Sequence, residues 1–105
     1  MSGVHHLYKV VADVRFAHSA QGRAFSVEAE RFGADIVRIE GDITDFWFND
    51  LSLRWKDGPA AIAGLTEHGP LFCLERLGWD HRMRVVFRHE HLDERHEPVF
   101  SWVIA

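Results

Sequence analysis

The amino-acid sequence predicts one α+β domain, built on a mainly antiparallel sheet of five to six strands with one or two short helices packed on one face. Two observations predict this fold class. Apolar and polar residues alternate with a period of two near both ends of the chain, whereas helical spacing is confined to its middle. The 105 residues match the common size of a single domain, so we assign residues 1–105 to one core.

The first part of the chain is predicted to form three strands joined by tight turns. Apolar side chains occupy most even positions from residue 4 to residue 16, which indicates a half-buried strand. A second strand is expected over 25–30 and a shorter third strand over 36–40. Gly22 and Gly33 permit the turns between them, and strands joined by tight turns pair antiparallel.

The segment 44–55 has two possible structures. Phe46 and Phe48 share one parity, whereas Leu53 and Trp55 share the other. A strand with a β-bulge near residues 49–50 would bring both sets onto one face, and we favour it. A helical turn through 43–49 is the alternative.

Helical signals follow this segment. Asp57 precedes Pro59 at the spacing of a helix N-terminus, which predicts a short helix over 60–65. A second helix is expected over 71–77, where leucines recur every third residue, with Gly78 as its stop. The two helices, or one helix broken before residue 71, are expected to lie across the sheet.

The last part of the chain returns to strands. Residues 82–92 alternate again, the charged run 93–97 predicts a turn, and 99–104 is apolar on both faces. A strand that is apolar on both faces is either central in its sheet or part of a subunit interface. The predicted element order is therefore β-β-β-(β)-α-α-β-β.

Charge and composition argue against several classes of function. The net charge of −4 and a pI near 6.0 disfavour nucleic acid as a partner, because phosphate binding needs a basic surface. No apolar run approaches the ~20 residues of a membrane span, and no basic, apolar leader opens the sequence. Cys73 is the sole cysteine, so an internal disulfide is excluded and a cytoplasmic location is expected.

The histidines are the most informative candidate site residues. His89 and His91 follow the apolar face of their predicted strand, and an H-x-H pair on a strand directs both imidazoles to one side. Two such groups can bind one zinc or other divalent ion, with His6 as a possible third ligand. The tryptophans, Trp102 among them, could line an apolar pocket beside these histidines. The simpler interpretation is that the histidines are side chains at a strand end and the tryptophans are core.

An arginine row is predicted on the outward face of the same strand, at Arg82, Arg84 and Arg88. Cross-strand ion pairs with glutamates of neighbouring strands would explain it. Docking of an acidic protein partner is the alternative.

Three functional hypotheses follow, since no motif for a named reaction occurs in the sequence. The first is a binding or interaction module that self-associates as a homodimer through sheet faces or edges. The second is a small cofactor-independent enzyme or small-ligand binder, in which His6, His89 and His91 act in an apolar pocket. The third is a divalent-metal site on the H-x-H strand.

Overall fold

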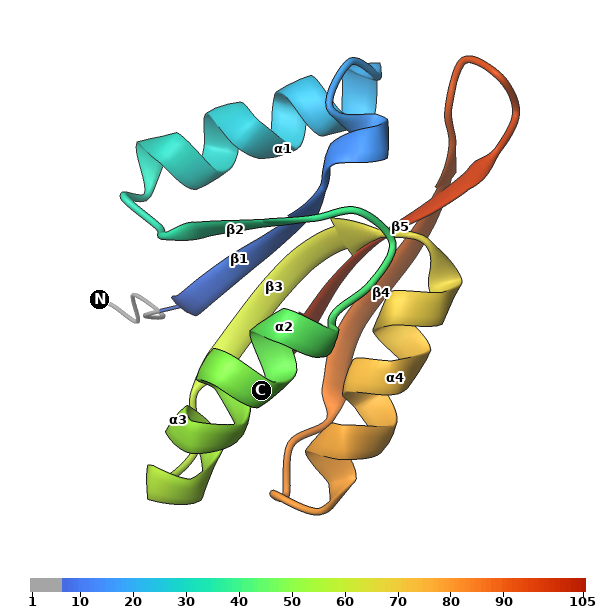
Figure 1. The fold of residues 1–105 in the computed structure, drawn as a ribbon. Helices are drawn as coiled ribbons and strands as arrows, with labels where there is room; N and C mark the ends of the chain where they lie inside the picture. The colour runs from blue at the N-terminus through green and yellow to red at the C-terminus, as the bar shows by residue number, and fades with distance from the viewer. Residues whose placement is uncertain (1–6) are drawn as a thin grey trace.

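A computed structural model describes residues Leu7–Ala105 and contains a five-stranded mixed sheet flanked by helices (Figure 1). The strands are β1 (Leu7–Asp13), β2 (Ile36–Ile39), β3 (Ala61–Thr66), β4 (Val85–Leu92) and β5 (Pro98–Ile104). The helices are α1 (Ala20–Arg31), α2 (Thr44–Phe46), α3 (Ser52–Asp57) and α4 (His68–Trp79). A 3₁₀ turn at Val14–Phe16 follows β1, and a π-helical segment, Trp47–Leu51, joins α2 to α3.

The strand order is β2-β1-β3-β5-β4, and the sheet is mixed rather than purely antiparallel. β1 pairs in parallel with both β2 and β3, whereas β5 is antiparallel to both β3 and β4. The α+β class is confirmed, but the predicted meander of the first three strands is wrong. Helices connect β1 to β2 and β2 to β3, and a helical crossover returns the chain in the same direction.

The first of these helices, α1, replaces the strand predicted over 25–30. Ser19 caps it, since its hydroxyl oxygen accepts the Gly22 N–H at 2.9 Å and donates to the Phe16 carbonyl at 2.7 Å. Gly22, Phe25 and Ala29 line its inner side at helical spacing, which the alternation of 25–30 concealed. A Cβ at position 22 would lie 1.9 Å from the Phe16 carbonyl oxygen, so this close approach requires glycine.

The segment 44–57 is helical, and the strand that we favoured there is wrong. α2, the π-helical segment and α3 form one continuous run whose buried side chains include Phe46, Leu51 and Trp55. The step from Phe46 to Leu51 is five residues, and the wider π turn keeps both on the inner side. A bulged strand and a π-widened helix therefore produce the same pattern in the sequence.

β3 lies where a short helix was predicted over 60–65. It runs between β1 and β5 and is buried on both faces, which explains its small and apolar side chains. The helix predicted over 71–77 is confirmed and is longer, beginning at His68 with Pro70 in its first turn. Gly78 lies within this helix rather than after it.

The two C-terminal strands agree more closely with prediction. β4 begins at Val85 rather than at residue 82, and β5 lies in the sheet between β3 and β4, as its two apolar faces indicated. In the turn between them, the Asp93 carboxylate accepts the backbone N–H groups of Arg95 and Glu97, each at 2.9 Å. These bonds and the nearby Arg95 guanidinium hold the pKa of Asp93 below its usual value.

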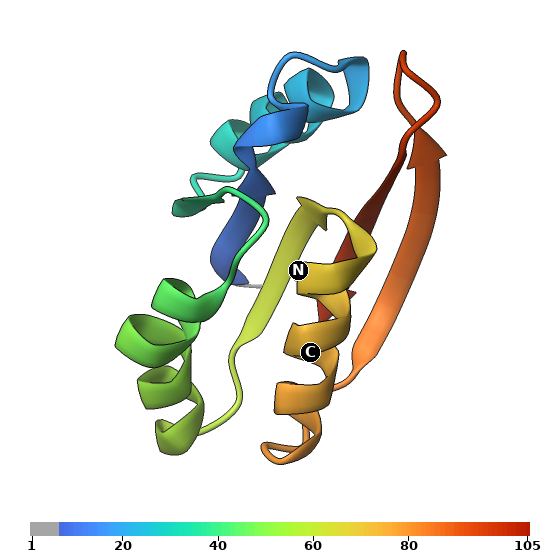
Figure 2. The ribbon, with the colours of Figure 1, turned by 45° about the vertical axis from the view of Figure 1, so that its right-hand side comes forward.

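Helices cover both faces of the sheet, not one face as predicted (Figures 1 and 2). α2, α3 and α4 pack on the face that carries Ile62 and Trp102, and this side holds the larger apolar core. α1 packs on the opposite face, where Phe25 and Leu65 belong to a smaller cluster. β4 is at one end of the sheet and β2 at the other, so each has one unpaired edge among the described strands.

Candidate functional site

β4 is a long edge strand whose exposed side chains are both apolar and polar. Its eight residues pair only with β5 among the described strands, and Val86, Phe87 and Leu92 are each more than half exposed. Natural edge strands are usually short, or carry lysine or proline that discourages pairing with another chain. β4 has neither residue; it carries the charged side chains of Arg88 and Glu90 and one bulge near its start, and from Phe87 to Leu92 its pairing with β5 is regular. The strand can therefore accept a further strand along most of its length.

The two histidines of β4 lie together on the face of the sheet opposite α4. His89 is opposite Ser101 of β5 and His91 is opposite Val99, and the centroids of the two imidazole rings are 4.4 Å apart. His91 Nε2 lies 3.0 Å from the Ser101 hydroxyl oxygen. Partial burial, together with His89, lowers the pKa of His91, so its ring is neutral at neutral pH.

The other predicted site residues do not join this pair. Trp102 lies on the opposite face, fully buried, where its indole N–H donates to the Thr66 hydroxyl at 3.0 Å. His6 lies outside the described residues. Among residues 7–105, no three histidine, cysteine, aspartate or glutamate side chains are grouped as a metal site.

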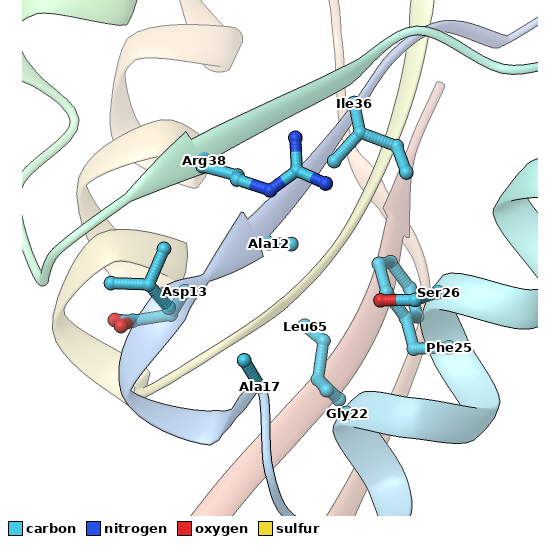
Figure 3. A pocket seen from close by; sticks show the side chains of 10 residues that line it. Ala12, Asp13, Ala17, Gly22, Phe25, Ser26, Ile36, Arg38 and Leu65 are labelled. Atoms are coloured by element: carbon cyan, nitrogen blue, oxygen red, sulfur yellow. The ribbon is translucent and has the colours of Figure 1, made fainter.

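A small cavity lies beside α1 (Figure 3), and neither His89 nor His91 lines it. Its volume is about 40 Å³, and its lining includes Ala12, Phe25, Ile36 and Leu65. A volume of that size admits water but not a metabolite, since small-molecule pockets usually span roughly 300–1,000 Å³. This cavity is therefore too small to be the ligand pocket predicted around His89 and His91, and it lies elsewhere.

The carboxyl ends of β1 and β3, where open α/β sheets commonly bind ligands, are filled by the protein's own side chains. Asp13 is buried and accepts two hydrogen bonds from the Arg15 side chain and one from the Gly41 N–H, and Arg15 also pairs with Glu67. At the start of α1, the Ala20 N–H donates to the Glu94 carboxylate at 2.8 Å. These polar groups therefore find their hydrogen-bond and ion-pair partners within the protein. The sequence patterns did not predict this polar cluster.

The predicted arginine row is not continuous on one strand. Arg82 and Arg84 precede β4, and Arg88 forms an ion pair with Glu75 of α4 at 3.2 Å instead of pairing with a glutamate of a neighbouring strand. Glu28, expected on a strand, lies on α1 and pairs with Arg31.

The Glu75–Arg88 ion pair also shows which side of α4 faces β4. Helical spacing places Phe72 and Trp79 on the same side as Glu75, and both rings are about half exposed, at 45% and 51%. Arg76 lies over both rings, with its guanidinium carbon 4.9 Å from the Trp79 centroid. We define the β4 edge surface as Phe72, Trp79, Val86, Phe87 and Leu92, which are half of the ten large apolar side chains that are prominently exposed in the described structure.

The chain matches none of the protein families, curated proteins or solved structures with which it was compared. No helix within residues 7–105 is long and apolar enough to span a membrane.

Proposed function

We propose that this protein is a cytoplasmic interaction module that forms a homodimer through the β4 edge. The exposure of an eight-residue edge strand with apolar side chains is the observation that carries the proposal. Antiparallel pairing of β4 with β4 of a second copy would join two five-stranded sheets into one. The exposed free thiol of Cys73 and the absence of any other cysteine fit the reducing cytoplasm.

The β4 sequence is complementary to itself in one register. In a two-fold antiparallel pair centred on His89, Arg88 of each copy lies opposite Glu90 of the other, and Val86 lies opposite Leu92. The neighbouring registers that keep the same faces aligned are centred on Arg88 or on Glu90, and each would oppose two like charges. Both charge and apolar contacts therefore favour the register centred on His89.

The same register extends the interface beyond the strands. A two-fold axis perpendicular to the sheet keeps both α4 helices on one face, so Phe72 and Trp79 of each copy would flank the new strand pair. Such side chains suit an interface, because aromatic residues and arginine are enriched at the centres of protein–protein contacts.

A charge-reversal series tests this register. With Glu90→Arg, each copy would place an arginine opposite Arg88 of the other copy. The two attractive Arg88–Glu90 pairs of the dimer would thus become two repulsive pairs. At about 0.2–1 kcal/mol for each gain or loss, dimerisation weakens by about 1–4 kcal/mol, or roughly 5- to 800-fold in Kd. Sedimentation velocity across a concentration series measures the change. Glu30→Arg, an equal charge change on exposed α1, is the control and should leave the wild-type dimer intact.

Exchanging the charges of Arg88 and Glu90 restores their attraction across the interface. This swap distinguishes the effect of the proposed register from a general effect of charge on dimerisation. Because Arg88 also contacts Glu75, the swap is made in a Glu75→Gln background. Adding Arg88→Glu to Glu75→Gln/Glu90→Arg should recover the dimer. A wild-type protein that sediments as a monomer at every concentration contradicts the proposal, and a Glu90→Arg variant that dimerises as well as Glu30→Arg contradicts the register.

A further inference from the structure

The opposite edge of the sheet carries a groove that the proposed dimer does not use. It lies between β2 and the helical run that begins with α2, and its volume is about 410 Å³. Val37 is partly exposed there, and the buried core residues Ile39 and Phe46 form the floor of the groove. The volume falls in the roughly 300–1,000 Å³ range of sites that hold a ligand or several side chains.

β2 presents unpaired backbone groups beside this groove. The Val10 N–H donates to the Asp35 carbonyl at 2.8 Å, and Val10 lies opposite Ile36 in the parallel register. In a parallel ladder this pattern turns the N–H and C=O of Val37 toward β1, so those of Ile36 and Arg38 point outward. Two residues of β2 therefore present hydrogen-bonding groups that an added strand could pair.

Carboxylates surround the apolar side chains of the groove. Glu40, Asp42, Asp45 and Asp50 line it, against one cation, Arg38. Asp50 is partly neutralised, because it accepts the Tyr8 hydroxyl and lies 4.0 Å from the Lys9 ammonium. Within residues 7–105, no ion pair involves Glu40 or Asp45.

We infer that this groove binds an extended basic segment of another protein, which adds to β2 as a strand. The outward groups of Ile36 and Arg38 pair with the backbone of the segment. Alternate side chains of the segment enter the groove, apolar ones onto the partly exposed Val37 and cationic ones toward the carboxylates of Glu40 and Asp45. Charge complementarity selects the partner, since an acidic segment would meet the same carboxylates with repulsion.

The test uses a seven-residue lysine–valine peptide in which valine and lysine alternate along the odd positions and threonine fills the even positions, so that both residue types face the groove, with two matched control peptides. One control replaces each lysine by glutamate. The other keeps the sequence but is N-methylated throughout, which removes its backbone donors while its charge stays the same. Isothermal titration measures affinity, and hydrogen exchange of the protein locates the bound peptide.

We expect the lysine–valine peptide to bind and to slow amide exchange at 36–40. Glu40→Gln/Asp45→Asn should weaken binding roughly 3- to 30-fold, since exposed or partly exposed ion pairs contribute about 0.3–1 kcal/mol each. Glu28→Gln/Glu30→Gln on α1 is the matched control and should leave affinity unchanged.

Three results would overturn the inference. They are absence of binding, equal binding of the N-methylated peptide, and protection at 85–92 rather than at 36–40. Equal binding by the N-methylated peptide would indicate attraction between charges without strand addition. Because the β2 groove and the β4 edge are at opposite ends of the sheet, each of the two proposals can fail alone.

Discussion

Replacing Gly64 by alanine should destabilise this fold severely, because the added methyl group has no space. Gly64 of β3 lies opposite Trp102 of β5, and a Cβ at position 64 would lie 2.2 Å from the nearest carbon of the indole ring. Ordinary carbon–carbon contact begins near 3.4 Å, so the ring would have to move by more than 1 Å. Trp102 is 1% exposed and is held by its hydrogen bond to Thr66.

The expected cost combines two effects. Forcing an extra methyl group into a packed core costs about 1–3 kcal/mol. Moving the ring also weakens the Trp102–Thr66 hydrogen bond, whose net contribution is about 0.5–1.5 kcal/mol. We expect Gly64→Ala to lower the free energy of unfolding by about 2–4 kcal/mol. For a domain of this size, that corresponds to a Tm lower by roughly 10–25 °C.

Urea denaturation followed by tryptophan fluorescence measures this loss. Gly69→Ala is the matched control, because no atom lies within 4 Å of a Cβ at that position of α4, and alanine should stabilise the helix slightly. Combining Gly64→Ala with Trp102→Phe should cost less than the sum of the two single changes, since the smaller ring makes room for the methyl group. Strict additivity, or equal stability of Gly64→Ala and Gly69→Ala, would refute the steric argument.

Three further predictions concern other parts of the chain. Gly22→Ala should destabilise the protein more than Gly64→Ala, as measured in the same urea assay, because its methyl group would meet the Phe16 backbone carbonyl rather than a movable ring. Since folding lowers the pKa of His91 below its ordinary 6.5, the unfolded chain takes up the proton first, so stability should fall as pH decreases from about 7.5 to 5. His91→Gln should flatten that slope in chemical denaturation measured at each pH. Asp93→Asn keeps an oxygen acceptor in the β4–β5 turn but removes the carboxylate that titrates. The Tm of the wild type should fall as pH decreases below about 4, and the Tm of the variant should fall less over the same range.

The parts of the fold that the sequence predicted correctly are those where one pattern has one structural meaning. β5 was expected to be either central or part of a subunit interface because both of its faces are apolar, and it is central; α4 was expected from leucines at helical spacing. α1 was missed although Ser19 supplied an N-cap signal, because the alternation of Phe25, Val27 and Ala29 fits a strand equally well. Because α1 and the 44–57 helix connect β1 to β2 and β2 to β3, these three strands run parallel. Predicting strands in place of the two helices therefore also predicted antiparallel pairing.

The relative placement of the two β4 histidines was predictable for a related reason. The period of two placed His89 and His91 on one face, and their rings do lie together. The same pattern could not show that β4 would be an edge strand, because strand order depends on long-range pairing. Nor could it place Trp102, whose side of the sheet depends on the register between β4 and β5.

The position of β5 between β3 and β4 has a consequence for how the chain folds. Among the described strands β4 pairs only with β5, so β4 can enter the sheet only together with β5 or after it. Hairpins close in about 1–10 μs, whereas the Ile62–Ile104 pairing must close a loop of some forty residues and is slower. Until β5 docks against β3, it exposes its own unpaired edge along with Val99 and Trp102. During that interval the unpaired edge of β5 is open to a second chain, so a strand-swapped dimer is a competing product of folding.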